Sequence, residues 1–169
     1  MVGEKSSQYT YEKTGYKGIA IQLARRKVRD YALKDIQKSI DLINRTRSGF
    51  LKGLKEIVYL AETMETWEYG KEVLSRGWYN ESEKILYLFN RGSLSPSSVL
   101  NHELGHHVFH ELLEKRFGRK ILGIPNGREE IADIIVEILR DKTYGRKLLI
   151  ETFRFTPQEI KEIEQILGL

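Results

Sequence analysis

The chain has 169 residues, of which 40% are hydrophobic, and a net charge of +4, which is enough apolar material for one core of ordinary size. It contains no cysteine, which excludes a disulfide framework and any thiolate metal site. No apolar run approaches the roughly 20 residues that cross a bilayer, and residues 1–13 lack the apolar stretch of a signal peptide. We therefore expect a single soluble, cytoplasmic domain over residues 1–169.

The N-terminal third carries the positive charge, with 13 Lys and Arg against 6 Asp and Glu in residues 1–60. Residues 1–18 are polar, and we expect them to form a loose start. From about Ile19 to Asn44, apolar residues recur at approximately helical spacing, which predicts a long amphipathic helix. The basic cluster at residues 25–29 is typical of a solvated helix face, so nucleic acid is not expected as a partner.

Three segments have the β-branched and aromatic content of strands, namely residues 55–60, 77–80 and 84–89. The polar turn between the last two predicts an antiparallel hairpin. The secondary structure of residues 63–74 is ambiguous from the sequence. We therefore expect a small, mostly antiparallel sheet of three strands.

Helices are predicted in the second half of the chain. Ser95 and Pro96 supply a cap and a first helical residue, and the helix that they begin is expected to end near residue 117, before Gly118. A second helix is expected over residues 126–142 and a third from Thr156 onward. A long helix, three strands and then these helices predict an α+β fold.

All four histidines of the protein fall within nine consecutive residues, at positions 102, 106, 107 and 110. His102, Glu103 and His106 form an HExxH motif on the first of these helices. There, His106 lies about 40° around the axis from His102 and one turn along it, so both rings can bind one metal ion. Glu103 lies about 60° from His106, which suits a general base that takes a proton from zinc-bound water.

Elimination narrows the candidates for the third metal ligand. His110 lies about 12 Å along the helix from His102, and His107 points about 100° away from His106, so one straight helix cannot bring them together. Since the chain has no other histidine and no cysteine, the ligand is expected to be an acidic residue of another segment. The helix after residue 126 offers Glu129, Glu130 and Asp133.

The HExxH motif, followed by Glu129-Glu130-Ile131-Ala132-Asp133, resembles the gluzincin peptidases, in which a Glu of an ExxSD or ExxAD segment completes the site. The resemblance implies a zincin-like fold, Zn²⁺ as the cofactor and Glu129 as the ligand, with Glu130 as the fallback. It also implies that Asp133 bonds a ligand histidine, His102, and fixes its tautomer.

The same resemblance implies an edge strand that binds an extended peptide or protein substrate, which we assign to Trp78, Tyr79 and Asn80. Gluzincins often stabilise the oxyanion with a Tyr or a His. Because every histidine here lies on the motif helix, we expect Tyr144 in this role. Residues 77–136 are also similar to ImmA/IrrE-type metallopeptidases, in which HELGHxxxH and a downstream Glu recur, and both resemblances imply the same ligands.

Two alternatives stand beside these expectations. Asn126 with Glu129 three residues later is the pattern of a capping box, which would explain that acidic residue without a metal. The whole chain is also compatible with a non-catalytic or latent zinc-binding domain that acts through a protein or nucleic-acid partner. The sequence leaves the substrate preference and the oligomeric state open. The main expectation is a zinc-dependent peptidase with Glu103 as its general base.

Overall fold

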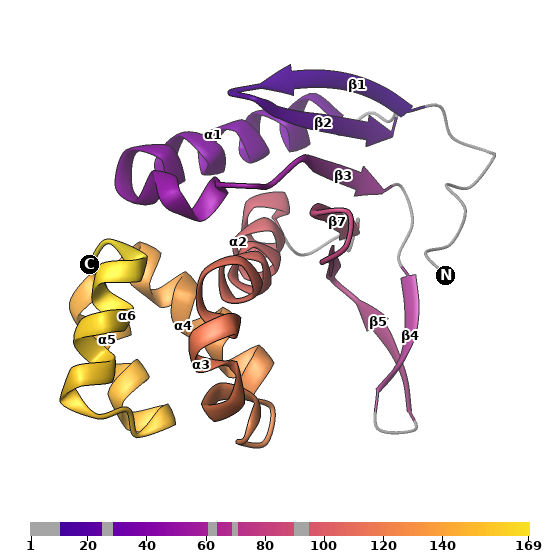
Figure 1. The fold of residues 1–169 in the computed structure, drawn as a ribbon. Helices are drawn as coiled ribbons and strands as arrows, with labels where there is room; N and C mark the ends of the chain where they lie inside the picture. The colour runs from indigo at the N-terminus through magenta and orange to yellow at the C-terminus, as the bar shows by residue number, and fades with distance from the viewer. Residues whose placement is uncertain (1–10, 25–28, 61–63, 69–70, 90–94) are drawn as a thin grey trace. The chain divides into compact units, whose positions relative to one another are not determined.

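A computed structural model describes residues 11–24, 29–60, 64–68, 71–89 and 95–169 of the chain (Figure 1). The chain divides into two compact units, Met1–Ile40 with Leu54–Leu100 and Asp41–Gly53 with Asn101–Leu169. Among the described helices, none is long and apolar enough to span a membrane. The expected single domain over residues 1–169 stays a prediction.

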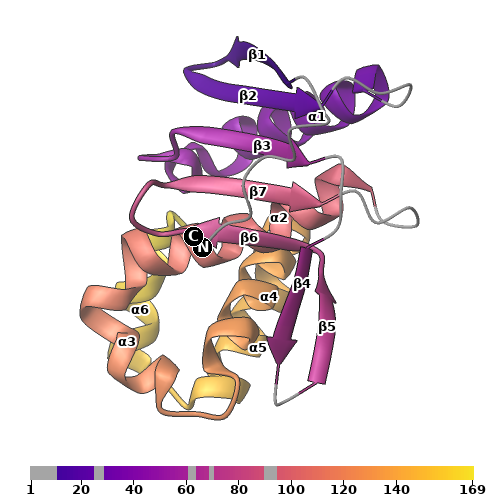
Figure 2. The same cartoon turned by 90° about the vertical axis from the view of Figure 1, so that its right-hand side faces the viewer.

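The first unit contains a five-stranded mixed sheet, whose described strands have the order β1-β2-β3-β7-β6 (Figure 2). Strand β2 pairs antiparallel with β1, β3 pairs parallel with both β2 and β7, and β6 pairs antiparallel with β7. Another two strands, β4 and β5, form a separate antiparallel ribbon. The strands are β1 (Tyr11–Tyr16), β2 (Ile19–Ala24), β3 (Glu56–Leu60), β4 (Met64–Glu68), β5 (Lys71–Ser75), β6 (Gly77–Asn80) and β7 (Ile85–Phe89).

The expectation of a three-stranded, mostly antiparallel sheet is wrong, although the general α+β class fits. The hairpin of β6 and β7 is confirmed. What the expectation lacks is the hairpin of β1 and β2, whose two-residue turn has positive φ at Lys17 (49°) and Gly18 (81°). Two such residues form the turn whose twist matches that of paired strands. Part of the segment expected to be loose is therefore an ordered strand.

The long N-terminal helix begins later than expected. Residues 19–24 form β2, and helix α1 covers Arg29–Arg47, followed by a short 3₁₀ turn, η1 (Ser48–Leu51). Ile19, Ile21 and Leu23 are buried while Ile36 and Ile40 form the inner face of α1. The first three alternate with period two, as a strand does, whereas the α1 residues are spaced four apart. One expected helix is thus a strand followed by a helix.

The motif helix is longer than expected. It begins as α2 (Pro96–Val108), passes through one π-helical turn, η2 (Phe109–Leu113), and continues as α3 (Glu114–Leu122). Its start is capped as expected, since the Ser98 amide donates to Ser95 Oγ at 3.2 Å. Gly118 does not end it, because Phe117 and Ile121, four residues apart, keep an apolar face buried on both sides of this glycine.

Three more helices complete the second unit, namely α4 (Gly127–Arg140), α5 (Lys142–Phe153) and α6 (Pro157–Leu167). The expected start at Thr156 is confirmed, because Thr156 and Glu159 form a reciprocal capping box. Helix α5 was not expected, and its N-cap residue is Asp141, whose carboxylate accepts hydrogen bonds from two backbone amides. Helix α4 packs against both α3 and α5. The buried core of this unit includes Leu104, Ile131, Ile135, Leu149 and Ile163.

Candidate metal centre

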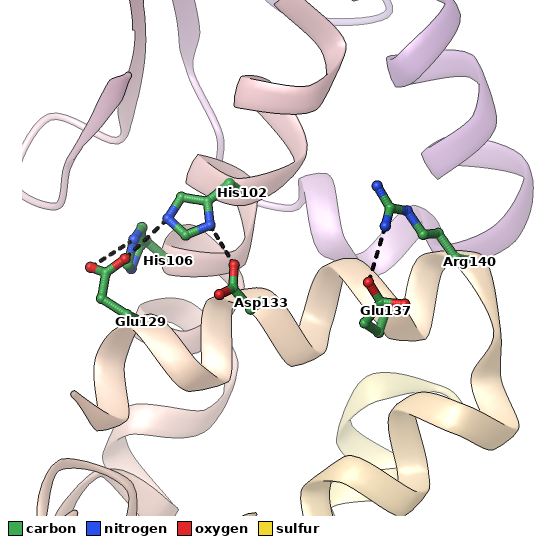
Figure 3. Close-up of polar contacts among 6 residues, drawn as sticks. All are labelled: His102, His106, Glu129, Asp133, Glu137 and Arg140. Atoms are coloured by element: carbon green, nitrogen blue, oxygen red, sulfur yellow. Dashed lines mark hydrogen bonds and ion pairs between the residues drawn. The ribbon is translucent and has the colours of Figure 1, made fainter. Parts of the chain in front are cut away.

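Helices α2 and α4 bring together two histidines and one glutamate (Figure 3). His102 Nε2 lies 3.1 Å from Glu129 Oε2, and His106 Nε2 lies 3.4 Å from Glu129 Oε1. One ligand atom from each of the three residues lies within 4.8 Å of the others. His102, His106 and Glu129 thus form a group that could hold a metal ion.

The spacing and chemistry of these atoms fit a small divalent cation. Donors at about 2.0–2.1 Å from a tetrahedral ion lie about 3.3 Å from one another. The two nitrogen-to-oxygen distances of 3.1 and 3.4 Å are close to that value. The rings of His102 and His106 meet edge to face, with centroids 5.0 Å apart, so neither blocks the other. Two imidazoles and a carboxylate are also a common donor set for such an ion.

The start of α4 decides between the two roles considered for Glu129. Asn126 is the N-cap residue, with a left-handed backbone (φ 56°), but its side chain makes no capping hydrogen bond. The carboxylate of Glu129 instead faces the two histidines. The capping-box alternative is therefore wrong for this helix. Glu130, the fallback ligand, is exposed and does not belong to the His-His-Glu group.

Asp133 lies one turn beyond Glu129 on α4, and its Oδ1 is 2.8 Å from Nδ1 of His102. Figure 3 shows the His102 ring between the two carboxylates, with one ring nitrogen facing each. This is the pair that the sequence analysis expected. A carboxylate on the outer nitrogen of a ligand histidine holds the ring in one orientation and raises its basicity.

His106 lacks the support that His102 has. Its Nδ1 atom is buried and forms no hydrogen bond with the residues that the structure describes. A buried polar group left unpaired costs roughly 1–3 kcal/mol. The two histidines therefore differ at Nδ1, which faces a carboxylate in His102 and meets no hydrogen-bond partner among the described residues in His106.

Charge complementarity within the group shifts two pKa values in opposite directions. The hydrogen bond with Glu129 raises the pKa of His102 to about 9, and the charges of Glu103 and Asp133 add to this while burial opposes it. Hydrogen bonds from His102 and then His106 hold the pKa of the Glu129 carboxyl far below its usual range. In the absence of metal, a proton on His102 therefore supplies part of the positive charge that a cation would bring.

Glu103 follows His102 on α2 and is almost completely buried, with 5% of its surface exposed. Burial raises the pKa of this carboxyl to about 7, although the charges of His106 and His102 act against the rise. A carboxyl with this pKa can both accept and release a proton near neutral pH. Glu103 is not itself a member of the His-His-Glu group, which we also call the ligand group, but it is the next residue after His102.

The other two histidines have different surroundings. His107 is completely buried, and its Nε2 lies 3.0 Å from the Lys52 carbonyl oxygen. His110 lies in the π-helical turn, with Nδ1 2.6 Å from Glu114 Oε2. Neither belongs to the His-His-Glu group, as helix geometry led us to expect.

Tyr144 is not brought together with the ligand group. It lies in the first turn of α5 with 48% of its surface exposed. The next residue, Gly145, lies against the backbone of Ile138 on α4. Ile138 is nine residues after Glu129, which is about 13 Å along the helix at 1.5 Å per residue. The structure thus offers no support for Tyr144 as an oxyanion donor.

The three residues expected to bind substrate lie on β6, at the edge of the described sheet. Trp78 is 36% exposed and stacks on Tyr87 with ring centroids 5.4 Å apart. Tyr79 is buried, and the Asn80 amide donates to Glu83 Oε2 at 2.7 Å within its own turn. These residues belong to the first unit and the ligand group to the second, so their role stays a prediction.

The sequence analysis does not single out Gly105, which the structure places in a close contact between α2 and α4. Its position inside a predicted helix is a signal that could have indicated such a contact, because a glycine there costs roughly 0.5–1 kcal/mol relative to alanine.

Residues 25–28 of the basic cluster lie outside the described residues.

No family model matches this sequence, and no curated protein matches it. Function is therefore argued from the chemistry of the His-His-Glu group and of Glu103 beside it.

Proposed function

We propose that this protein is a zinc-dependent peptidase that hydrolyses peptide bonds with Glu103 as general base. One observation carries the proposal. A buried carboxyl, that of Glu103, directly follows on the same helix a histidine of the His-His-Glu group. The resemblance of the HExxH and ExxAD segments to gluzincin peptidases supports the same reaction.

The donor set favours zinc in a catalytic rather than a purely structural role. Structural zinc sites are closed by four protein ligands, whereas catalytic sites use three and leave a position for water or substrate. Here the described residues supply three ligands, His102, His106 and Glu129. The Glu129 side chain is 55% exposed, so the group is open to solvent. This openness argues against the alternative of a non-catalytic zinc-binding domain.

When bound, zinc would polarise the peptide carbonyl and lower the pKa of a water molecule. Glu103 accepts a proton from the attacking water as the new carbon–oxygen bond forms. It then delivers that proton to the leaving nitrogen as the peptide carbon–nitrogen bond breaks. Asp133 bonds Nδ1 of His102 and so fixes the orientation of the ring, whose other nitrogen, Nε2, would bind zinc. Peptide substrates and a cytoplasmic location remain expectations from the sequence.

The proposal is tested with Glu103→Gln, which keeps the size of the side chain and removes its ability to carry the proton. Zinc content should persist, while hydrolysis of casein or of a peptide library should fall by about 10²–10⁴-fold. Glu137→Gln is the matched control, because Glu137 lies on α4 and pairs with Arg140 at 3.0 Å, away from the ligands (Figure 3). Unchanged hydrolysis by Glu103→Gln would exclude the mechanism. A zinc-loaded wild type that cleaves nothing would favour the non-catalytic alternative.

A further inference from the structure

Helices α2 and α4 touch through their backbones at Gly105 and Ala132. A Cβ atom built on Gly105 would lie 2.5 Å from the Ala132 carbonyl oxygen, 2.7 Å from its Cα and 2.9 Å from its carbonyl carbon. Real Cβ atoms essentially never approach other atoms to less than 3.0 Å, and all three neighbours here are backbone atoms that cannot turn away. Even an alanine at position 105 would push the two helices apart.

This contact involves the direct sequence neighbours of two residues of the site. Gly105 immediately precedes His106 on α2, and Ala132 immediately precedes Asp133 on α4. The imidazoles come from one helix and the carboxylate of Glu129 from the other. The distance between the helices at residues 105 and 132 therefore sets how closely imidazole nitrogens and carboxylate oxygens approach.

We propose that Gly105 is a positioning residue for the metal group, and that its missing side chain sets the spacing of α2 and α4 that metal binding needs. The inference rests on the proposed zinc site. To reach ordinary contact, the Cβ of an alanine must move from 2.5 Å to at least 3.4 Å from the Ala132 oxygen. Ligand distances in a metal site hold to within about 0.2 Å, so this separation exceeds what the three ligands can absorb.

The chain offers two matched glycine-to-alanine controls. At Gly145 a Cβ would lie 2.8 Å from N and 2.9 Å from Cα of Ile138, which is a backbone clash with α4 away from the ligands. At Gly118 a Cβ would meet the side chain of Glu114 at 3.1 Å and nothing else among the residues that the structure describes. Alanine is otherwise preferred over glycine inside a helix. Gly145→Ala thus measures the effect of a backbone clash with α4 away from the ligands. Gly118→Ala measures the effect of a glycine-to-alanine change in a helix without a backbone clash.

Zinc affinity is measured by competition with a chromophoric chelator on the wild type, Gly105→Ala, Gly145→Ala and Gly118→Ala, with circular dichroism to check folding. We expect Gly105→Ala to bind zinc at least about tenfold more weakly than the wild type, a loss comparable to that from removing a residue that orients a ligand. The two controls should stay within about threefold of the wild type. A folded Gly105→Ala protein with wild-type affinity, or a loss matched by Gly145→Ala, would overturn the inference. A wild type that binds no zinc would instead overturn the proposed function, and the inference with it.

Ala132→Gly provides a second test that does not depend on the folding of Gly105→Ala. The contact involves the backbone of residue 132, so removal of its methyl group leaves the helix spacing in place. The melting temperature should fall, because a glycine inside a helix is unfavourable, but zinc affinity should stay within about threefold of the wild type. A loss of about tenfold or more would show that side-chain packing sets the spacing, contrary to the inference.

Discussion

His102 and Asp133 are joined across α2 and α4, with the imidazole Nδ1 2.8 Å from the carboxylate Oδ1. A carboxylate accepts hydrogen bonds and cannot donate them, so the proton of a neutral ring is held on Nδ1. In the metal-free protein Nε2 also carries a proton, which faces Glu129 at 3.1 Å and must leave before this atom can bind a metal ion. The Asp133 contact therefore selects Nε2 as the ring nitrogen that loses its proton when a metal ion binds.

Asp133→Asn should weaken zinc binding by about 10–100-fold, as is typical when the partner of a ligand histidine is lost. The asparagine amide can donate to Nδ1, which would place the ring proton on Nε2, the atom that the metal needs. Isothermal titration with zinc measures the effect, and Glu137→Gln on the same helix serves as the control. Equal affinities for Asp133→Asn and the wild type would show that the contact does not support the site.

Glu129 and Glu130 should respond very differently to the same substitution. Glu129→Gln removes the charge that faces both histidines, and zinc affinity should fall by at least about 100-fold, or roughly 2.8 kcal/mol. Glu130→Gln should change it by less than about threefold, because an exposed side chain outside the ligand group contributes little. Titration of both variants with zinc separates the two residues. The reverse order of losses would assign the ligand to Glu130.

The metal site could be predicted from the sequence only in part. His102, Glu103 and His106 share one helix, so helical spacing alone predicts that they lie close together. The third ligand depends on how α4 packs on α2, and that packing is decided by a backbone contact between Gly105 and Ala132. Spacing within one helix says nothing about such a contact, so the residues alone left several acidic candidates open.

The pairing of the strands in the sheet could also be predicted only in part. The hairpin of β6 and β7 was predictable because its strands are adjacent in the sequence and separated by a polar turn. The parallel pairs of β3 with β2 and with β7 join segments far apart in the chain, and no local pattern specifies them. In β2, the apolar residues Ile19, Ile21 and Leu23 alternate as in a strand. The apolar residues that follow have helical spacing, so the whole stretch was interpreted as one helix.

The metal-free protein should lose stability as the pH rises from about 6 to 9. The pKa of Glu103 is raised from 4.5 to about 7, and that of His102 from 6.5 to about 9. Both groups bind a proton more tightly when folded, so their contribution is complete at low pH and is lost as the pH rises through these values. Glu129, with its lowered pKa, acts in the opposite sense and only under acid conditions, below its usual pKa of 4.5.

For His102 the loss is on the order of 1–2 kcal/mol, after allowance for the solvent that screens its half-exposed partner Glu129. The melting temperature of the metal-free protein, followed by circular dichroism, should therefore decrease over this range. His102→Gln should remove the part of the decrease above about pH 6.5. A melting temperature that stays constant or rises between pH 6 and 9 would contradict the assigned interactions.

Removal of the metal should leave the second unit folded. The ligand side chains lie partly in solvent, whereas Leu104, Ile131 and Ala132 on the same two helices are completely buried and hold them together without a metal. Zinc at 100 times its dissociation constant adds about 2.7 kcal/mol. In a chain of this length each kcal/mol shifts the melting temperature by about 2–4 °C, so chelation should lower it by roughly 5–10 °C. Calorimetry with and without a chelator measures this shift, and His102→Gln, which has lost a ligand, should show almost none. Loss of the helical circular dichroism signal on chelation at 25 °C would instead mean that the metal holds the fold together, which is the behaviour of a structural zinc site.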